Sequence, residues 1–187
     1  MDSSLTQIVL LALSFSVAFN LFLTLRLIAI VGAGRARLPF SVVIGERLPN
    51  FHGKVYSNGR LMTSGELLGQ AAVLVFLSAG CDKCMARIPE LKQISHAMER
   101  LGVPLWVIAV DSTRNIARHL EDSVLLQKIL VLDLLTRQAL NPGSAAPFYI
   151  FVDHGGTVQA RDLIGDENWL LFTRQLHEDQ TRIETGQ

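Results

Sequence analysis

Residues 72–84 read AVLVFLSAGCDKC, an apolar run that leads into two closely spaced cysteines. The part from Ala72 to Leu77 has the length of a strand and contains no polar residue. Such a run is typical of a strand that helices cover on both faces of a mostly parallel sheet. The predicted strand therefore delivers the chain directly to Cys81 and Cys84.

A helix is predicted behind the cysteines, from about residue 81 to residue 100. Its apolar residues recur at spacings of three and four: Ile88, Leu91, Ile94, Met98 and Leu101. This periodicity predicts a helix with one buried face, and Gly102 is suited to end it. Both sulfurs are therefore expected in the first turn of a helix that follows a buried strand.

Two further apolar runs, residues 105–110 and 129–132, predict buried strands, and residues 113–126 predict a helical stretch between them. Repetition of strand, helix and strand predicts parallel pairing. The pattern as a whole predicts an α/β fold in which helices flank a central mixed sheet.

Glycine-containing turns predict two antiparallel hairpins. Asn58-Gly59 separates two short apolar segments, and residues 153–156 separate residues 148–152 from residues 157–160. Both patterns are typical of hairpin turns. A last helix is predicted from about residue 167 to residue 180.

Basic and acidic side chains balance, with 17 Lys and Arg against 17 Asp and Glu. A chain without net charge creates no field that attracts nucleic acid, so no nucleic-acid partner is expected. The length of 187 residues fits one ordinary domain with a short appendage.

The appendage is an apolar N-terminal segment. Residues 8–25 contain no charged side chain, and after Arg26 the chain stays apolar through Val31. As a helix, this segment is long enough to cross a bilayer core of roughly 30 Å. A cleaved signal peptide is the competing interpretation, but the basic n-region is missing and the apolar run is longer than such peptides carry. We therefore expect an uncleaved anchor in the lipid bilayer.

These boundaries divide the chain into a transmembrane anchor over residues 1–31, a juxtamembrane linker over residues 32–41 and a globular domain over residues 42–187. The linker contains Arg35 and Arg37, which can meet anionic lipid headgroups. Because these basic residues follow the apolar run, the positive-inside rule would hold them, and the domain behind them, in the cytoplasm.

Cys81 and Cys84 are the only cysteines of the chain, in the spacing C-x-x-C. At a helix N-terminus, unpaired N–H groups and the positive end of the helix dipole stabilise a thiolate and lower the pKa of the first cysteine. We therefore expect Cys81 to be the catalytic nucleophile and Cys84 to resolve the mixed disulfide. Because the two sulfurs carry the electrons, this exchange needs no organic cofactor and no metal.

Two other uses of the cysteine pair have less support. A structural zinc site needs four ligands, and the five histidines are scattered along the chain: His52, His96, His119, His154 and His177. A purely structural disulfide that closes so small a loop adds little stability. A redox-active pair is therefore the preferred interpretation.

Residues 76–91, FLSAGCDKCMARIPEL, resemble the active-site segment of membrane-anchored thioredoxin-like proteins of the TlpA/ResA group, including the methylamine-utilisation MauD type. In that group a proline-x-leucine follows the second cysteine, and Pro89 and Leu91 match it. The similarity extends from about Ile44 to the last helix. It implies a thioredoxin fold and a thiol–disulfide oxidoreductase activity.

A second hallmark of these proteins is a cis-proline before the last strand pair, and Ala146-Pro147 stands at that place. The resemblance implies that Pro147 packs beside the cysteines and that the backbone of Ala146 contacts the substrate chain. An ordinary trans-proline at the start of a strand is the alternative.

The dipeptide between the cysteines, Asp82-Lys83, differs from the family's familiar pairs. In this fold the dipeptide tunes the reduction potential. Lys83 is expected to favour the Cys81 thiolate and Asp82 to oppose it, so their net effect stays open. Ala79-Gly80 also replaces the aromatic residue that commonly precedes the motif.

Two positions lack an acid that relatives carry. The buried acid of thioredoxin is replaced by Val75, and the acid that ResA-like proteins have three residues after the second cysteine is replaced by Arg87. A cation one turn from Cys84 is expected to favour thiolate. The alternative is that Arg87 is a solvated charge on the helix face.

The resemblance implies protein disulfide or dithiol substrates, a membrane redox partner for recycling, and a role in maturing extracytoplasmic proteins. It places the chain in a bacterial-type cytoplasmic membrane as a single-pass protein with an extracytoplasmic domain. The basic residues behind the anchor favour the opposite orientation, and the sequence does not resolve this conflict.

Two other functions compete with this interpretation. A non-enzymatic binding module could use the same scaffold to hold a partner at the membrane, but it has no chemical reason to keep both cysteines. In a thioredoxin-related peroxidase, the reactive cysteine stands in a loop with threonine and arginine partners rather than in C-x-x-C.

Overall fold

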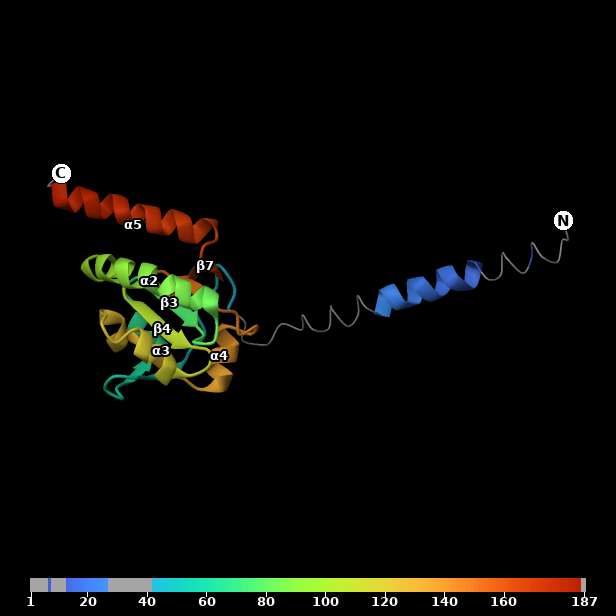
Figure 1. The fold of residues 1–187 in the computed structure, drawn as a ribbon, viewed down its shortest axis with the longest axis horizontal. Coiled ribbons are helices and arrows are strands. Elements are labelled where there is room, and N and C mark those ends of the chain that lie inside the picture. The colour runs from blue at the N-terminus through green and yellow to red at the C-terminus, as the bar shows by residue number, and fades with distance from the viewer. Residues whose placement is uncertain (1–6, 8–12, 27–41, 186–187) are drawn as a thin grey trace. The chain divides into compact units, whose positions relative to one another are not determined.

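The computed structural model describes residue 7 and residues 13–26 and 42–185, and the chain divides into two units, Met1–Leu38 and Pro39–Gln187 (Figure 1). In the first unit, residues 13–26 form a helix. The rest of the predicted anchor and the whole predicted linker, residues 32–41, lie outside the described residues. Within the described ranges, no helix has both the length and the apolar character needed to cross a bilayer.

The second unit is built on a four-stranded sheet with the order β4-β3-β6-β7. Its strands are β3 (Ala72–Leu77), β4 (Leu105–Ala109), β6 (Phe148–Val152) and β7 (Val158–Leu163). β3 pairs in parallel with β4 and antiparallel with β6, and β6 forms a hairpin with β7. The predicted buried strands at residues 72–77 and 105–110, the parallel pairing of these two strands and the second hairpin are thus confirmed.

A smaller sheet has the order β2-β1-β5, with β1 (His52–Val55), β2 (Leu61–Thr63) and β5 (Leu130–Leu132). The first predicted hairpin is confirmed, because β1 and β2 pair antiparallel across the Asn58-Gly59 turn. The predicted parallel pairing of the 129–132 strand was wrong in the main. β5 pairs antiparallel with β1, and its parallel pairing with β4 is limited to one isolated bridge, from Val107 to Ile129, the residue before β5. β1, which is far from β5 in the sequence, forms the backbone hydrogen bonds of β5 that were expected to go to β4.

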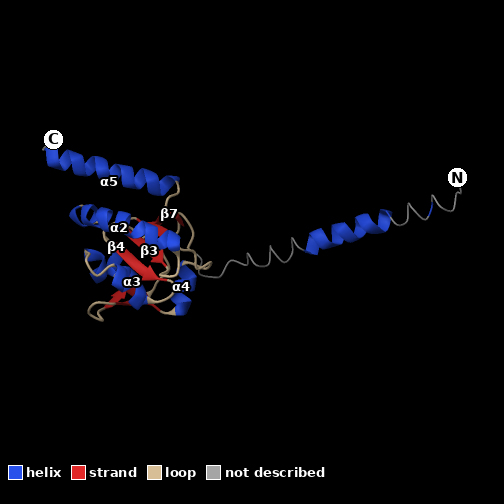
Figure 2. Cartoon of the chain, viewed as in Figure 1, coloured by secondary structure: helices blue, strands red, loops and turns tan. Residues whose placement is uncertain are grey.

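Alternation along β3 explains why all six of its side chains are buried. Val73, Val75 and Leu77 face one apolar cluster, and the residues between them face another. The first cluster includes the buried face of α2 (Asp82–Arg100) and the start of α5 (Glu167–Thr185). α2 and α5 contact each other on the same side of the sheet (Figures 1 and 2), and Trp169 of α5 packs on Tyr149 and Phe151 of β6. The second cluster includes Leu140 of α4 (Leu134–Leu140).

The short elements between β4 and β6 differ most from the predicted pattern. In place of one helical stretch there are α3 (Thr113–His119) and the 3-10 helix η2 (Val124–Lys128). The sequence did not predict α4, because two of its three leucines, Leu134 and Leu135, are exposed and the helix has no amphipathic pattern. Its N-cap is Asp133, whose carboxylate accepts the Thr136 N–H at 2.8 Å.

Truncation of the central strand is expected to be costly. Leu74 is fully buried, so Leu74→Ala should lower the free energy of unfolding by about 2–5 kcal/mol, because it removes buried methyl groups and leaves a cavity. The matched change Leu135→Ala, at a leucine that is 77% exposed, should change it by less than about 0.5 kcal/mol. Urea denaturation measures both, and equal losses would contradict the assignment of β3 as the core strand.

Candidate active site

The two cysteines lie where the buried strand β3 passes into helix α2. Cys81 is the N-cap residue of α2, and its sulfur accepts the N–H of Cys84 at 3.4 Å. The Cys81 side chain is partly exposed, whereas Cys84 is fully buried in the first apolar cluster. Both are free thiols. One sulfur is thus presented to solvent, and the other stands directly behind it.

The two thiols differ in acidity. Hydrogen bonds from the thiol and the N–H of Cys84, and from the N–H of Lys83, lower the pKa of Cys81, although burial and the Asp82 charge act against them. Burial, above all, raises the pKa of Cys84 to about 12. The exposed sulfur is therefore the one that ionises more readily, which is the arrangement a nucleophile and a resolving thiol require.

The segment around Pro147 closes the other side of the site. The Ala146–Pro147 peptide bond is cis, as the resemblance implies. The Cys81 thiol donates to the carbonyl oxygen of Ala146 at 3.6 Å, and the Pro147 carbonyl accepts the N–H of Ile164 at 3.0 Å. The fold therefore brings Ala146 and Pro147 to the cysteines from more than sixty residues away along the chain.

Asp82 and Lys83 are both exposed on the first turn of α2. The Asp82 carboxylate acts on Cys81 in the expected direction, because its charge opposes formation of the thiolate. The contribution of Lys83 to the lowered pKa of Cys81 comes through its backbone N–H. A backbone N–H of the first helical turn thus stabilises the Cys81 thiolate, which is the effect that was expected of the Lys83 ammonium group.

Arg87 has a partner of its own. Its guanidinium forms an ion pair with Glu90 at 2.8 Å, and the other carboxylate oxygen of Glu90 accepts the indole N–H of Trp169 at 2.7 Å. The guanidinium also packs so closely on Gly165 that a Cβ there would lie 2.5 Å from it. Arg87 therefore fastens α2 to the start of α5, and its role in tuning Cys84 stays a prediction.

Asp111, two residues beyond the end of β4, is part of the site although the sequence analysis did not select it. Its carboxylate accepts the Ser78 hydroxyl at 2.8 Å and the N–H groups of Ala79 and Gly80, each at 3.2 Å. It thus binds the three residues that connect β3 to Cys81. Parallel strands end at the same edge of a sheet, so an acid just after the second buried strand was the available signal.

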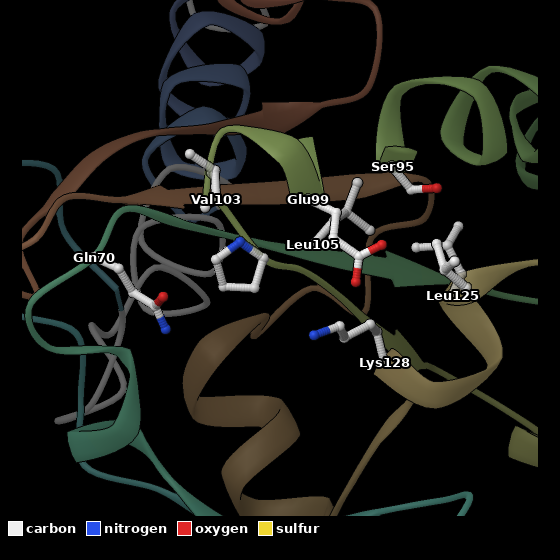
Figure 3. A pocket seen from close by; sticks show the side chains of 10 residues that line it. Gln70, Ser95, Glu99, Val103, Leu105, Leu125 and Lys128 are labelled. Atoms are coloured by element: carbon white, nitrogen blue, oxygen red, sulfur yellow. The ribbon is translucent and has the colours of Figure 1, made fainter. Parts of the chain in front are cut away.

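Other features of the domain lie away from the cysteines. In the part of the chain that the structure describes, no three His, Cys, Asp or Glu side chains cluster in a way that could hold a metal ion. A cavity of about 140 Å³ lies among Gln70, Glu99, Leu105 and Lys128 (Figure 3). It is at the beginning of β4, whereas the cysteines are beyond the end of β3. The cavity is therefore separate from the site of the cysteines.

Residues 44–176 match the model of the AhpC/TSA family. The chain belongs to the AhpC/TSA family. Within this AhpC/TSA chain, the cysteine pair takes the form Cys81-x-x-Cys84. No curated protein sequence matches the chain.

Solved structures show that this AhpC/TSA protein has the thioredoxin fold. The thioredoxin domain of a thiol-disulfide oxidoreductase from Bacteroides vulgatus superposes with a TM-score of 0.60 at 19% identity, covering 73% of this chain and 99% of that one. A thiol:disulfide interchange protein of the thioredoxin family from Chlorobium tepidum gives 0.59 at 19% identity, covering 74% and 98%. A secreted Mycobacterium tuberculosis disulfide oxidoreductase homologous to DsbE of E. coli gives 0.52 at 24% identity, covering 60% and 81%. The predicted fold is thus confirmed.

The lowered pKa of Cys81 has a direct consequence for its reactivity. Only the thiolate is alkylated, so a thiol with a lowered pKa stays reactive at lower pH. The rate of Cys81 alkylation by iodoacetamide should reach half its maximum below the value of about 8.5 expected for a free cysteine. Cys81→Ser should abolish the fast reaction, because Cys84 is buried. A midpoint above that of a free cysteine would contradict the arrangement.

Two variants serve as a matched pair for the same measurement. Asp82→Asn removes a charge that raises the pKa of Cys81 and should shift the midpoint to lower pH. Arg87→Gln should leave the midpoint unchanged, because the guanidinium is held by Glu90. A rise of the midpoint in Arg87→Gln would show instead that the Arg87 charge acts on Cys81.

Proposed function

We propose that this chain is a membrane-tethered thiol–disulfide oxidoreductase of the TlpA/ResA-like, MauD-related type, which exchanges its dithiol or disulfide with protein partners. The contact between the cysteines carries this proposal. The sulfur of Cys81, which is partly exposed and has a lowered pKa, accepts the N–H of Cys84 at 3.4 Å. The Cys84 thiol is fully buried and becomes reactive only after Cys81 has formed the mixed disulfide. The names of the similar structures, which include disulfide oxidoreductases and interchange proteins, support the same activity.

The reduction of a client proceeds in two exchanges. The Cys81 thiolate attacks one sulfur of the client disulfide, the client S–S bond breaks, and the other client sulfur leaves as a thiolate that takes up a proton. Cys84 then loses its proton and attacks the Cys81 sulfur of the mixed disulfide, which releases the second client sulfur. Two electrons pass from the cysteine pair to the client, and the same steps in reverse oxidise a dithiol client.

The surroundings of Cys81 suit a polypeptide client. The carbonyl oxygen of Ala146, 3.6 Å from the reactive sulfur, is an acceptor for a backbone N–H of an extended segment. Three small or apolar residues near the cysteines, Ala79, Met85 and Ala146, are each only partly buried against the core. A shallow surface of this kind accommodates varied side chains next to a client disulfide.

The proposed cycle is tested with the two serine variants of the purified full chain and a disulfide-containing protein such as insulin. Cys81→Ser should lose reduction of the client altogether, because no attacking thiolate remains. Cys84→Ser should attack once and remain as a mixed disulfide, visible as a covalent adduct on a non-reducing gel. Full activity of Cys81→Ser would overturn the role of Cys81, and a wild type that fails to reduce the client would favour the non-enzymatic binding module.

We propose further that the domain is extracytoplasmic and that the anchor lies in a bacterial-type cytoplasmic membrane. The uncharged run over residues 8–25 is long enough for an anchor, and one similar structure is of a secreted protein. Recycling then requires a second thiol protein at the membrane. Arg35 and Arg37, which follow the apolar run, favour the opposite orientation.

Orientation is measured with a membrane-impermeant maleimide on cells whose outer membrane has been permeabilised. Cys81 is the accessible thiol of the chain, so it should be labelled before lysis if the domain is extracytoplasmic. Cys81→Ser is the control for specificity. Labelling that appears only after lysis would overturn the extracytoplasmic placement and support the positive-inside orientation.

A further inference from the structure

The Asp111 carboxylate is saturated with donors from two segments of the chain. One oxygen accepts the Ser78 hydroxyl at 2.8 Å and the Gly80 N–H at 3.2 Å, and the other accepts the N–H groups of Ala79 at 3.2 Å and Ser112 at 2.6 Å. Although burial opposes it, these hydrogen bonds lower the pKa of Asp111. The carboxylate is therefore ionised at neutral pH and ties the 78–80 segment to the end of β4.

The strand register explains why this tie is possible. Leu77 pairs with Ala109, and the N–H of Val110 donates to the carbonyl of Leu77 at 2.8 Å, which extends the parallel pairing by one step. Continued by two residues, this register places Asp111 opposite Ala79, in the middle of the 78–80 segment. On the other side, the guanidinium of Arg137 donates to the carbonyl oxygens of Ala109 and Val110, so α4 fixes the backbone that carries Asp111.

Ser78 connects this tie to the buried thiol. Its hydroxyl donates to Asp111, and its backbone N–H donates to the sulfur of Cys84 at 3.5 Å. The N–H of Cys81 closes the turn on the Ser78 carbonyl at 3.3 Å. The hydrogen bond from the Ser78 N–H to the Cys84 sulfur therefore depends on the position of the turn formed by residues 78–81.

We propose, on the basis of the thiol–disulfide exchange proposed above, that Asp111 is a positioning residue for its second step. Its carboxylate holds residues 78–80 so that the Ser78 N–H stays on the Cys84 sulfur as that sulfur becomes negative. The Cys84 proton goes to solvent, a bond forms between the two cysteine sulfurs, the bond from Cys81 to the client breaks, and the client sulfur leaves with the electron pair. A hydrogen bond to a charged atom is stronger than one to a neutral atom, so the N–H favours the attacking thiolate.

The groups that act on Cys84 have opposing effects. Burial is the largest cause of its raised pKa, and the neighbouring Cys81 and the charge of Asp111 raise it further. The Ser78 N–H lowers the pKa of Cys84, and its effect exceeds that of the Asp111 charge. Loss of the tie should therefore make Cys84 harder to ionise, even though a negative charge disappears with it.

The two steps can be followed separately with 4,4′-dithiodipyridine, a neutral disulfide that the Asp111 charge does not repel. The reduced full chain is mixed with an equimolar amount in a stopped-flow instrument. Attack by Cys81 releases one thiopyridone, and resolution by Cys84 releases the second. Cys84→Ser, which should release only one, identifies the two phases.

In Asp111→Ala, we expect the first release to stay within about twofold of the wild type and the second to slow by about tenfold, the effect of losing one hydrogen bond to a charged group. The pH at half-maximal rate of the second release should rise. Asp153→Ala is the matched control: Asp153 also accepts turn N–H groups, from Gly155 and Thr157, but at the Val152 end of β6, opposite the cysteines. It should leave both phases unchanged.

Asp111→Asn keeps one oxygen acceptor and should restore part of the second rate. The proposal is overturned if the second release of Asp111→Ala is unchanged, if both phases slow by the same factor, or if Asp111→Asn is as slow as Asp111→Ala. Should Asp111→Ala fail to fold, Ser78→Ala keeps the carboxylate and its backbone donors but removes the hydroxyl link. It should slow the second release by about threefold, and an unchanged rate would equally overturn the proposal.

These outcomes are separate from those that test the activity itself. If the wild type releases only one thiopyridone, or if Cys81→Ser keeps the first release, the proposed exchange function fails whatever Asp111 does. If the wild type shows both phases and Asp111→Ala behaves like it, the exchange function stands and only the positioning role is lost.

Discussion

The parallel pairing of β3 and β4 is the constraint on which the site depends. Because parallel strands end at the same edge of a sheet, the residues that follow each strand meet there, with Ser78 after β3 and Asp111 after β4. β6 runs antiparallel to β3 and begins at this edge, so it brings Ala146 to the sulfur of Cys81. One edge thus collects residues from three distant parts of the chain.

The entry of the chain into α2 then separates the two sulfurs chemically. The first cysteine caps the helix at the surface, where N–H groups stabilise its thiolate, and the second is already within the apolar cluster one turn later. A spacing of three residues on a helix thus produces a large difference in burial. The difference in acidity follows from burial and from the hydrogen bond that the two cysteines share.

The helices behind this edge keep it in place. α2 is attached to α5 through the ion pair of Arg87 with Glu90 and the bond of Glu90 to Trp169. α4 is attached to the end of β4 through Arg137. Two charged residues near the cysteines, Asp111 and Arg137, thus hold backbone groups in place. The reactive sulfur of Cys81 is partly exposed at this edge, as suits a polypeptide client.

Local patterns alone identified the buried strand, the helix behind it, both hairpins and the two cysteines, because hydrophobic period and turn residues are properties of neighbouring positions. The same patterns found β5 but not its partner, because a strand of three residues carries no information about pairing. They missed α4, because a short helix with exposed leucines has no apolar stripe. The partners of Arg87 and the tie between Asp111 and Ser78 join residues far apart in the chain. They arise from strand register and helix packing, which take shape only when the chain is folded.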